Sequence, residues 1–157
     1  MNNLSDIFIT GPSFNQSGVC GPILRSLPEW FGIEASTLEY INCTDTQPTF
    51  VAHVNKQVAG FLTLKKHNTK SWEIYVMGVY PKYHRQGIGA KLIKSAEDFL
   101  RAGSCKYLQV KTLGPSHKDI NYAKTRKFYL SQDYIPLEEF TELWDPASPC
   151  LLLVKKL

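Results

Sequence analysis

The sequence predicts an α/β (α+β) domain with a central mixed sheet of about seven strands and about four helices. Two observations support this fold class. Short runs of β-branched and aromatic residues alternate with segments of helical spacing, in the order β-α-α-β-β-β-α-β-α-β-β. The fifth strand follows a crossover helix and is therefore expected to lie parallel to the fourth, whereas the strands before that helix are joined by short turns and are expected to be antiparallel.

The first half of the chain is expected to hold one strand, two helices and three linked strands. Ile7–Ile9 reads as a strand that Gly11-Pro12 ends, and 19–27 reads as a short helix. Helical character is also expected for 28–32. Ser36 is expected to cap a second helix, because a glutamate stands three residues later in a capping-box pattern. The three strands that follow are 49–54, 57–65 and 72–80.

The second half begins with a helix from Ile88, whose apolar residues recur at helical spacing. A strand is expected at 107–113 and a helix at 119–130, with Asp119 near its start. Two closing strands are expected at 134–143 and 149–156.

The amino-acid composition limits the functions that the chain could have. A chain of 157 residues with 43% apolar and 20% charged residues is expected to form one globular domain, 1–157. Its net charge of +4 is dispersed, so nucleic acid is not an expected partner. We expect no membrane span and no signal peptide, hence a cytoplasmic protein. The four cysteines form no C-x-x-C pair and His53, His67 and His117 have no metal-type spacing, so no metal is expected. These three histidines are expected to face solvent.

A glycine-rich turn, His84-Arg85-Gln86-Gly87-Ile88-Gly89-Ala90, joins the fourth strand to the following helix. Glycines let the backbone approach a ligand closely, and the first turn of a helix presents unpaired N–H groups, so the segment suits a phosphate or pyrophosphate. An ordinary tight corner is the alternative. Two other glycine loops are excluded, because no Lys-Ser/Thr pair follows and Leu92 stands where a dinucleotide fingerprint has its third glycine.

This turn resembles motif A of the GNAT superfamily of N-acyltransferases, [RQ]-x-x-G-x-[GA], with Gly78-Val79-Tyr80-Pro81 before it. His84 departs from the pattern, because the family has Arg or Gln there. The order of helices and strands is also that of the family, so the resemblance covers nearly the whole chain. It implies a twisted mixed sheet and an N-acetyltransferase that uses acetyl-CoA and an amine acceptor.

The resemblance also implies how acetyl-CoA is held. Backbone N–H groups of the turn would grip its pyrophosphate, and backbone groups of the fourth strand would pair with its pantetheine arm. Gly78 suits a bulge there, although relief of crowding would also explain this glycine. The residues implied are Met77, Gly78, Val79, Arg85, Gln86, Gly87, Ile88, Gly89 and Ala90.

Two residues are candidates for catalysis. Glu73 lies in an otherwise apolar strand and suits a general base, with an exposed strand-end glutamate as the alternative. Phe128-Tyr129, followed by Asp133-Tyr134, resembles the family pattern that ends in Gly-Phe. The match makes Tyr129 the proton donor to the thiolate of coenzyme A and leaves Asp133 at a left-handed cap, whereas Tyr129 as core filler is the alternative.

The acceptor side is less defined. The resemblance points to Glu29, Trp30 and Phe31, and Tyr75 lies on the same strand face as Glu73. Glutamates 138, 139 and 142 are competitors for the base or for binding a cationic acceptor. The acceptor is expected to be a primary amine of a small molecule or peptide, and the protein a monomer or homodimer. The alternative function is a non-catalytic acyl-CoA-binding sensor of the same fold.

Overall fold

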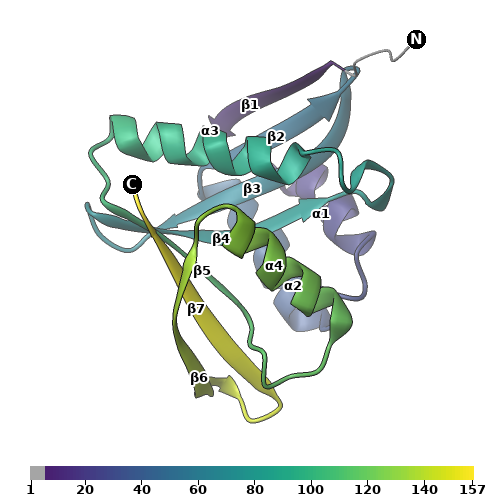
Figure 1. The fold of residues 1–157 in the computed structure, drawn as a ribbon. Helices are drawn as coiled ribbons and strands as arrows, with labels where there is room; N and C mark the ends of the chain where they lie inside the picture. The colour runs from purple at the N-terminus through teal and green to yellow at the C-terminus, as the bar shows by residue number, and fades with distance from the viewer. Residues whose placement is uncertain (1–5) are drawn as a thin grey trace. The chain divides into compact units, whose positions relative to one another are not determined.

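The computed structural model describes residues 6–157. Its seven strands form one mixed sheet in the order β1-β2-β3-β4-β5-β7-β6 (Figure 1), and four α-helices accompany them, which confirms the predicted fold class. The elements of the described residues are β1 (Ile7–Ser13), α1 (Ser17–Arg25), α2 (Glu34–Thr46), β2 (Thr49–Val54), β3 (Gln57–Lys66), β4 (Ser71–Val79), the 3₁₀-helix η1 (Pro81–Tyr83), α3 (Ile88–Ala102), β5 (Tyr107–Leu113), α4 (Ile120–Ser131), β6 (Ile135–Asp145) and β7 (Ser148–Lys156).

The chain divides into two compact units. The first holds the described residues up to Lys65 together with Tyr75–Phe99, and the second holds Lys66–Ile74 and Leu100–Leu157. The strand β4 therefore contributes its first four residues to the second unit and the remainder to the first. The expectation of a single domain stays a prediction.

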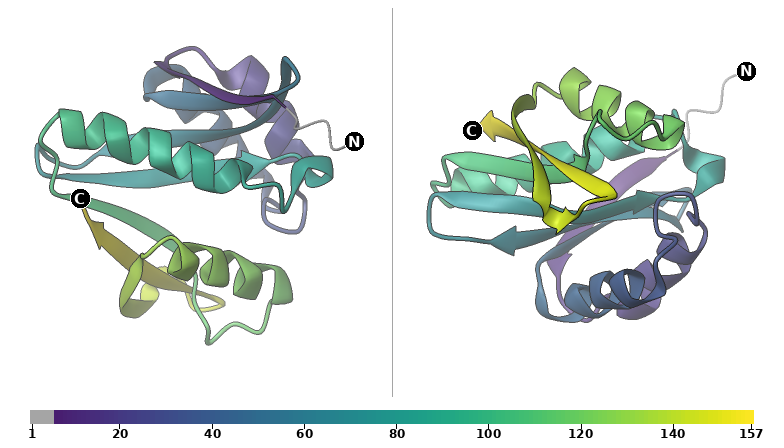
Figure 2. Two further views of the ribbon diagram at one scale, coloured as in Figure 1. Left: turned by 45° about the horizontal axis from the view of Figure 1, so that its top comes forward. Right: turned by 90° about the horizontal axis from the view of Figure 1, so that it is seen from below.

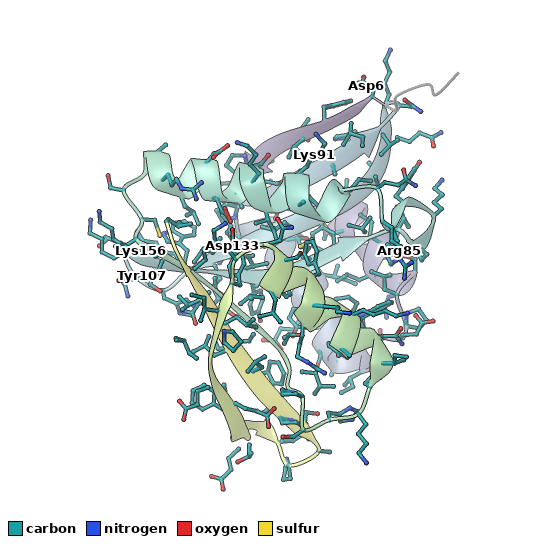
Figure 3. The ribbon with its side chains drawn as sticks, viewed as in Figure 1. Asp6, Arg85, Lys91, Tyr107, Asp133 and Lys156 are labelled. Atoms are coloured by element: carbon teal, nitrogen blue, oxygen red, sulfur yellow. The ribbon has the colours of Figure 1, made fainter. Side chains whose placement is uncertain are left out.

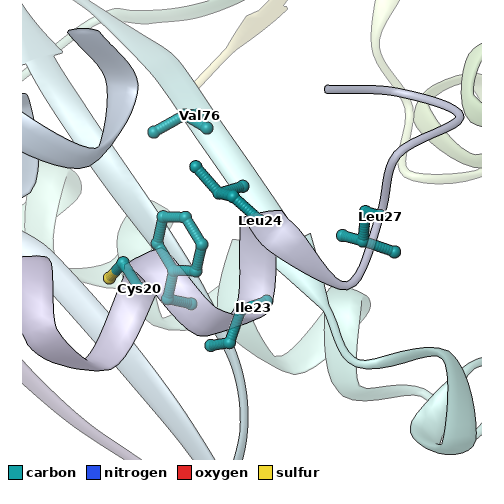
Figure 4. Close-up of a cluster of buried hydrophobic side chains, with 6 residues drawn as sticks. Cys20, Ile23, Leu24, Leu27 and Val76 are labelled. Carbon is teal, nitrogen blue, oxygen red and sulfur yellow. The ribbon is translucent and has the colours of Figure 1, made fainter. Parts of the chain in front are cut away.

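In the first unit, β1, β2 and β3 are antiparallel neighbours. The β2–β3 turn places Asn55 and Lys56 at φ values of 49° and 68°, the left-handed pair that a tight hairpin requires. Helices α1 and α2 lie on one face of these strands and α3 on the other (Figure 2). Figure 4 shows the apolar cluster that fixes α1 against the sheet, formed by Cys20, Ile23, Leu24, Leu27, Phe61 and Val76.

In the second unit, the start of β4 pairs with β5 in parallel, from Ser71↔Tyr107 to Ile74↔Val110, as the crossover predicted. On its other side β5 pairs with β7 in antiparallel register, beginning with Tyr107 opposite Lys156 (Figure 3), and β6 closes the hairpin. Helix α4 begins after Asp119, whose Oδ1 accepts the N–H groups of Asn121 and Tyr122 at 2.8 and 3.0 Å. The expected position of Asp119 near the helix start is confirmed.

Three predictions about the first unit are wrong. Helix α2 begins at Glu34, because Thr37 is fully enclosed and its N–H already donates to the carbonyl of Ile33, so Ser36 lies inside the helix rather than at its cap. Residues 28–30 form a turn rather than a helix, and the N–H groups of Trp30 and Phe31 both donate to the carbonyl of Leu27. Strand β1 continues through Gly11-Pro12 to Ser13, which a strand at the edge of a sheet tolerates.

Among residues 6–157, no helix is both long and apolar enough to cross a membrane. The cytoplasmic location expected from the sequence stays a prediction.

Candidate active site

The turn between η1 and α3 carries the residues that are expected to hold a pyrophosphate. Arg85, labelled in Figure 3, and Gly87 have φ values of 60° and 79°, and both residues are exposed. The first bond within the helix runs from the N–H of Lys91 to the carbonyl of Gly87, at 3.1 Å. The N–H groups of residues 88–90 lie in the first turn of α3, so the helix has no carbonyl four residues before them to accept their hydrogen bonds. They lie at the positive end of the helix dipole. This arrangement fits a pyrophosphate group.

His84, which departs from the family motif, fastens the start of this turn. Its Nε2 lies 2.7 Å from the carbonyl oxygen of Val79, and because a carbonyl only accepts, the ring donates this hydrogen bond. The ring also meets the edge of Trp30, with centroids 6.1 Å apart. The side chain of Gln86 donates in turn to the carbonyl of Lys82 at 3.1 Å. Side chains therefore hold the turn at two points.

The end of β4 carries the residues expected to meet the pantetheine arm. Met77, Gly78 and Val79 lie beyond Ile74, where pairing with β5 ends. A Cβ built on Gly78 would lie 3.2 Å from side-chain atoms of Ile23 and Leu27. The structure thus supports the relief of crowding as the reason for this glycine.

Glu73 is enclosed rather than exposed, since only 7% of its side chain is accessible. Its Oε1 lies 2.7 Å from Nε2 of His67 and 3.1 Å from Nζ of Lys111. Lys111 comes from β5, two residues after Gln109, which is the register partner of Glu73, and so shares its face of the sheet. The alternative of an exposed strand-end glutamate is wrong.

Sequence reasoning missed both partners of Glu73. His67 is an exposed residue, as expected, but its ring turns one nitrogen to the carboxylate. No local sequence pattern points to Lys111. The parallel register between β4 and β5 would have pointed to it, but that register is fixed by strand pairing rather than by any local motif.

Tyr129 lies near the end of α4 with 7% of its surface exposed, and its ring contacts those of Phe128 and Tyr134 at centroid distances of 5.4 and 5.9 Å. Burial, and to a smaller extent nearby Tyr122, raises the pKa of its hydroxyl above the ordinary value. The hydroxyl therefore keeps its proton, as a donor must. Asp133 has a φ of 69°, so its expected left-handed conformation is confirmed.

The acceptor-side candidates of the first unit include an aromatic row. Phe31 meets the edge of Tyr40 at 5.9 Å between centroids, and Tyr40 meets Tyr75 at 5.4 Å. Nζ of Lys65 lies over the ring of Tyr75, 5.0 Å from its centroid. Sequence reasoning named Phe31 and Tyr75 but missed Tyr40, which joins them. Glu29 is exposed.

Of the competing glutamates, Glu139 is engaged by the loop before α4. It accepts the backbone N–H of Ser116 at 3.1 Å and also the hydroxyl of that residue. These hydrogen bonds hold the pKa of the Glu139 carboxyl below its usual range. Because it anchors a loop, Glu139 is a weaker competitor for the base than Glu73.

Comparison with known families identifies the family to which this chain belongs. Residues 23–128 match the sequence profile of the Acetyltransferase (GNAT) family. The chain belongs to the GNAT acetyltransferase family. In a comparison by sequence, no curated protein matches it.

Solved structures share the GNAT fold at low identity. A protein from Desulfovibrio desulfuricans described as a GNAT-family acetyltransferase matches with a TM-score of 0.82 at 14% identity, covering 96% of this chain and 99% of that chain. A GNAT-family acetyltransferase from Elizabethkingia anophelis, solved with acetyl-CoA bound, gives 0.71 at 18%, with 96% and 98% covered. The aminoglycoside 6'-N-acetyltransferase from Enterococcus faecium gives 0.72 at 16%, with 95% and 96% covered. At these identities the likeness establishes the fold alone.

The thiols of this GNAT chain are poorly placed for nucleophilic chemistry. Burial raises the pKa of Cys20 and Cys43 to about 12 and that of Cys150 to about 11, so these thiols stay protonated near neutral pH. Cys105 is also buried. Within the part of the chain that the structure describes, no group of three or more His, Cys, Asp or Glu side chains could hold a metal ion.

Proposed function

We propose that this GNAT protein transfers the acetyl group of acetyl-CoA to a primary amine of a small molecule or peptide by direct attack. In that reaction an N–C bond forms to the acetyl carbon and the C–S bond breaks. Glu73 serves as the general base for the acceptor ammonium, directly or through water, and Tyr129 returns a proton to the thiolate of coenzyme A.

The observation that carries this proposal is the enclosed carboxylate of Glu73, placed on the strand that leads into the anion-binding turn. A module that only binds acyl-CoA needs the turn but gains nothing from a buried carboxylate, which is costly to bury. The hydroxyl of Tyr129 carries a proton for this reaction, and its raised pKa makes it a weaker acid than an exposed tyrosine. The protonated thiols favour direct transfer over an acetyl-cysteine intermediate.

The donor assignment rests on the turn. The amides of 85–90 hold the pyrophosphate of acetyl-CoA, and backbone groups of 77–79 pair with its pantetheine arm. The E. anophelis structure, with acetyl-CoA bound on the same fold, supports this choice of donor.

The acceptor assignment rests on the aromatic row. The rings of Phe31, Tyr40 and Tyr75 offer an aromatic surface against which the acceptor would pack, and the ammonium of Lys65 lies over the face of Tyr75. Trp30 and Phe31 contribute from the turn before α2, and Glu29 adds a negative charge at the surface.

The test measures release of free thiol from acetyl-CoA with a panel of amines. We expect turnover with at least one amine, and a loss of about 100-fold or more in kcat/KM for Glu73→Gln, as positioned proton transfer typically contributes. Tyr129→Phe should lower kcat, whereas Tyr107→Phe, which alters an exposed tyrosine, should not. Tight binding of acetyl-CoA without thiol release on any amine would instead support the sensor.

A further inference from the structure

The Glu73 carboxylate and the His67 ring form a pair that connects an enclosed group with solvent. The two side chains are 7% and 32% exposed, and 2.7 Å separates Oε1 from Nε2. A carboxylate accepts hydrogen bonds, so the ring donates its Nε2–H to Glu73. In the neutral ring the other nitrogen, Nδ1, is then a free acceptor.

Lys111 makes the carboxylate itself a poor final destination for a proton. Its ammonium lies 3.1 Å from the same Oε1, and 25% of its side chain is exposed. Protonating Glu73 would forfeit both this ion pair and the charged acceptor for the His67 ring. The Cys150 thiol also interacts electrostatically with Glu73 and Lys111, and burial keeps it protonated with a pKa of about 11. It cannot accept a proton near neutral pH.

We propose that His67 is the catalytic base and that Glu73 acts through it. Nδ1 of His67 takes the proton of the acceptor ammonium, which frees the nitrogen lone pair for attack on the thioester. The Glu73 carboxylate stays ionised, holds the ring by its Nε2–H and stabilises the imidazolium that forms, while Lys111 holds the carboxylate. The exposed ring then returns the proton to solvent. This inference rests on the proposed acetyl transfer and places the ring of His67, rather than a water molecule, between Glu73 and the acceptor.

A carboxylate that fixes the tautomer of a histidine and stabilises its charged form is a general device of acyl-transfer enzymes. Here the short turn between β3 and β4 brings the two residues together, since His67 follows the end of β3 and Glu73 lies near the start of β4. The backbone supports the arrangement, because the N–H of His67 donates to the carbonyl of Ser71 at 3.1 Å.

The test uses the full chain with the best amine from the panel. His67→Gln keeps a donor for Glu73 but no basic nitrogen, and we expect kcat/KM to fall by about 100-fold with loss of the acid limb of its pH profile. Glu73, Lys111 and Cys150 are unchanged in this variant, so a change in the pH profile reports on His67. His67→Ala should be rescued by added imidazole in proportion to its concentration, because imidazole can fill the space and accept the proton.

Controls separate this inference from the proposed function. His53→Ala removes a histidine that stacks on Phe8, and the variant should show wild-type rates with and without imidazole. Urea unfolding checks that each variant is folded. A wild type that turns over while His67→Gln keeps its rate, or while His67→Ala ignores imidazole, overturns the role of His67 alone. A wild type with no turnover on any amine overturns the proposed function.

Discussion

Gly87 allows a measurement of what the glycine turn at 84–90 requires of its backbone. Its φ is 79°, and a Cβ built on it meets no atom within 4 Å. Gly87→Ala therefore adds no clash, and its cost is the left-handed conformation alone, about 1–2 kcal/mol for a residue with a Cβ. Gly18, in α1, is a matched control, because its Cβ also meets nothing within 4 Å but its backbone is helical.

The conformational cost of Gly87→Ala can appear either in the stability of the free protein or in its affinity for acetyl-CoA. If the free protein keeps the turn as it is, the free energy of unfolding falls by about 1–2 kcal/mol. If the turn relaxes when free, binding must restore it, and the dissociation constant for acetyl-CoA rises by roughly 5- to 30-fold instead. Gly18→Ala should raise stability by about 0.5–1 kcal/mol through helix propensity and leave binding unchanged.

Urea unfolding followed by tryptophan fluorescence and calorimetric titration with acetyl-CoA measure the two parts. Their sum should be about 1–2 kcal/mol for Gly87→Ala. A Gly87→Ala protein that matches the wild type in both measurements would refute the reasoning, because the turn would then need neither glycine nor a left-handed residue.

Three further predictions concern stability and the turn. Lys111→Met should lower the free energy of unfolding, measured in urea, by about 1–3 kcal/mol. This is less than the loss expected for a fully buried ion pair, because Lys111 is partly exposed. An unchanged unfolding midpoint would show that the buried carboxylate of Glu73 does not require Lys111. His84→Ala removes a hydrogen bond worth about 0.5–1.5 kcal/mol and should weaken acetyl-CoA binding by about 2- to 10-fold in calorimetry, whereas equal affinity would exclude a role in holding the turn. The raised pKa of Cys20 and Cys43 means that the folded state keeps protons that the unfolded state releases, so the free energy of unfolding is highest below pH 9.0 and falls as the pH rises towards about 12. Urea unfolding at rising pH should show a shallower fall when both cysteines are replaced by alanine. An equal fall in the variant and the wild type would contradict this.

The elements that local sequence determines could be predicted. The glycine turn, the parallel placement of β5 after a crossover helix and the left-handed Asp133 all follow from short-range chemistry or from the family motif, and the structure bears them out. The start of α2 could not be predicted in this way, because burial of Thr37 outweighs the capping preference of Ser36.

The surroundings of Glu73 were also beyond local reasoning. The partners His67 and Lys111 reach it through a strand turn and through the register between β4 and β5, and neither leaves a spacing signal in the sequence. The same holds for the aromatic row, where Tyr40 on α2 joins Phe31 to Tyr75 on β4 by tertiary packing alone. Motif reasoning thus found the candidate residues, and the structure supplied what each one touches.

The most direct test of the account follows the acetyl group itself. The protein is incubated with acetyl-CoA labelled in the acetyl group and with the amine that gives the greatest thiol release, and acetylated amine and free coenzyme A are quantified together. Direct transfer predicts that the two products appear in equal amounts and that the protein carries no label. Release of coenzyme A without acetylated amine, or label held on a cysteine of the protein, would contradict it.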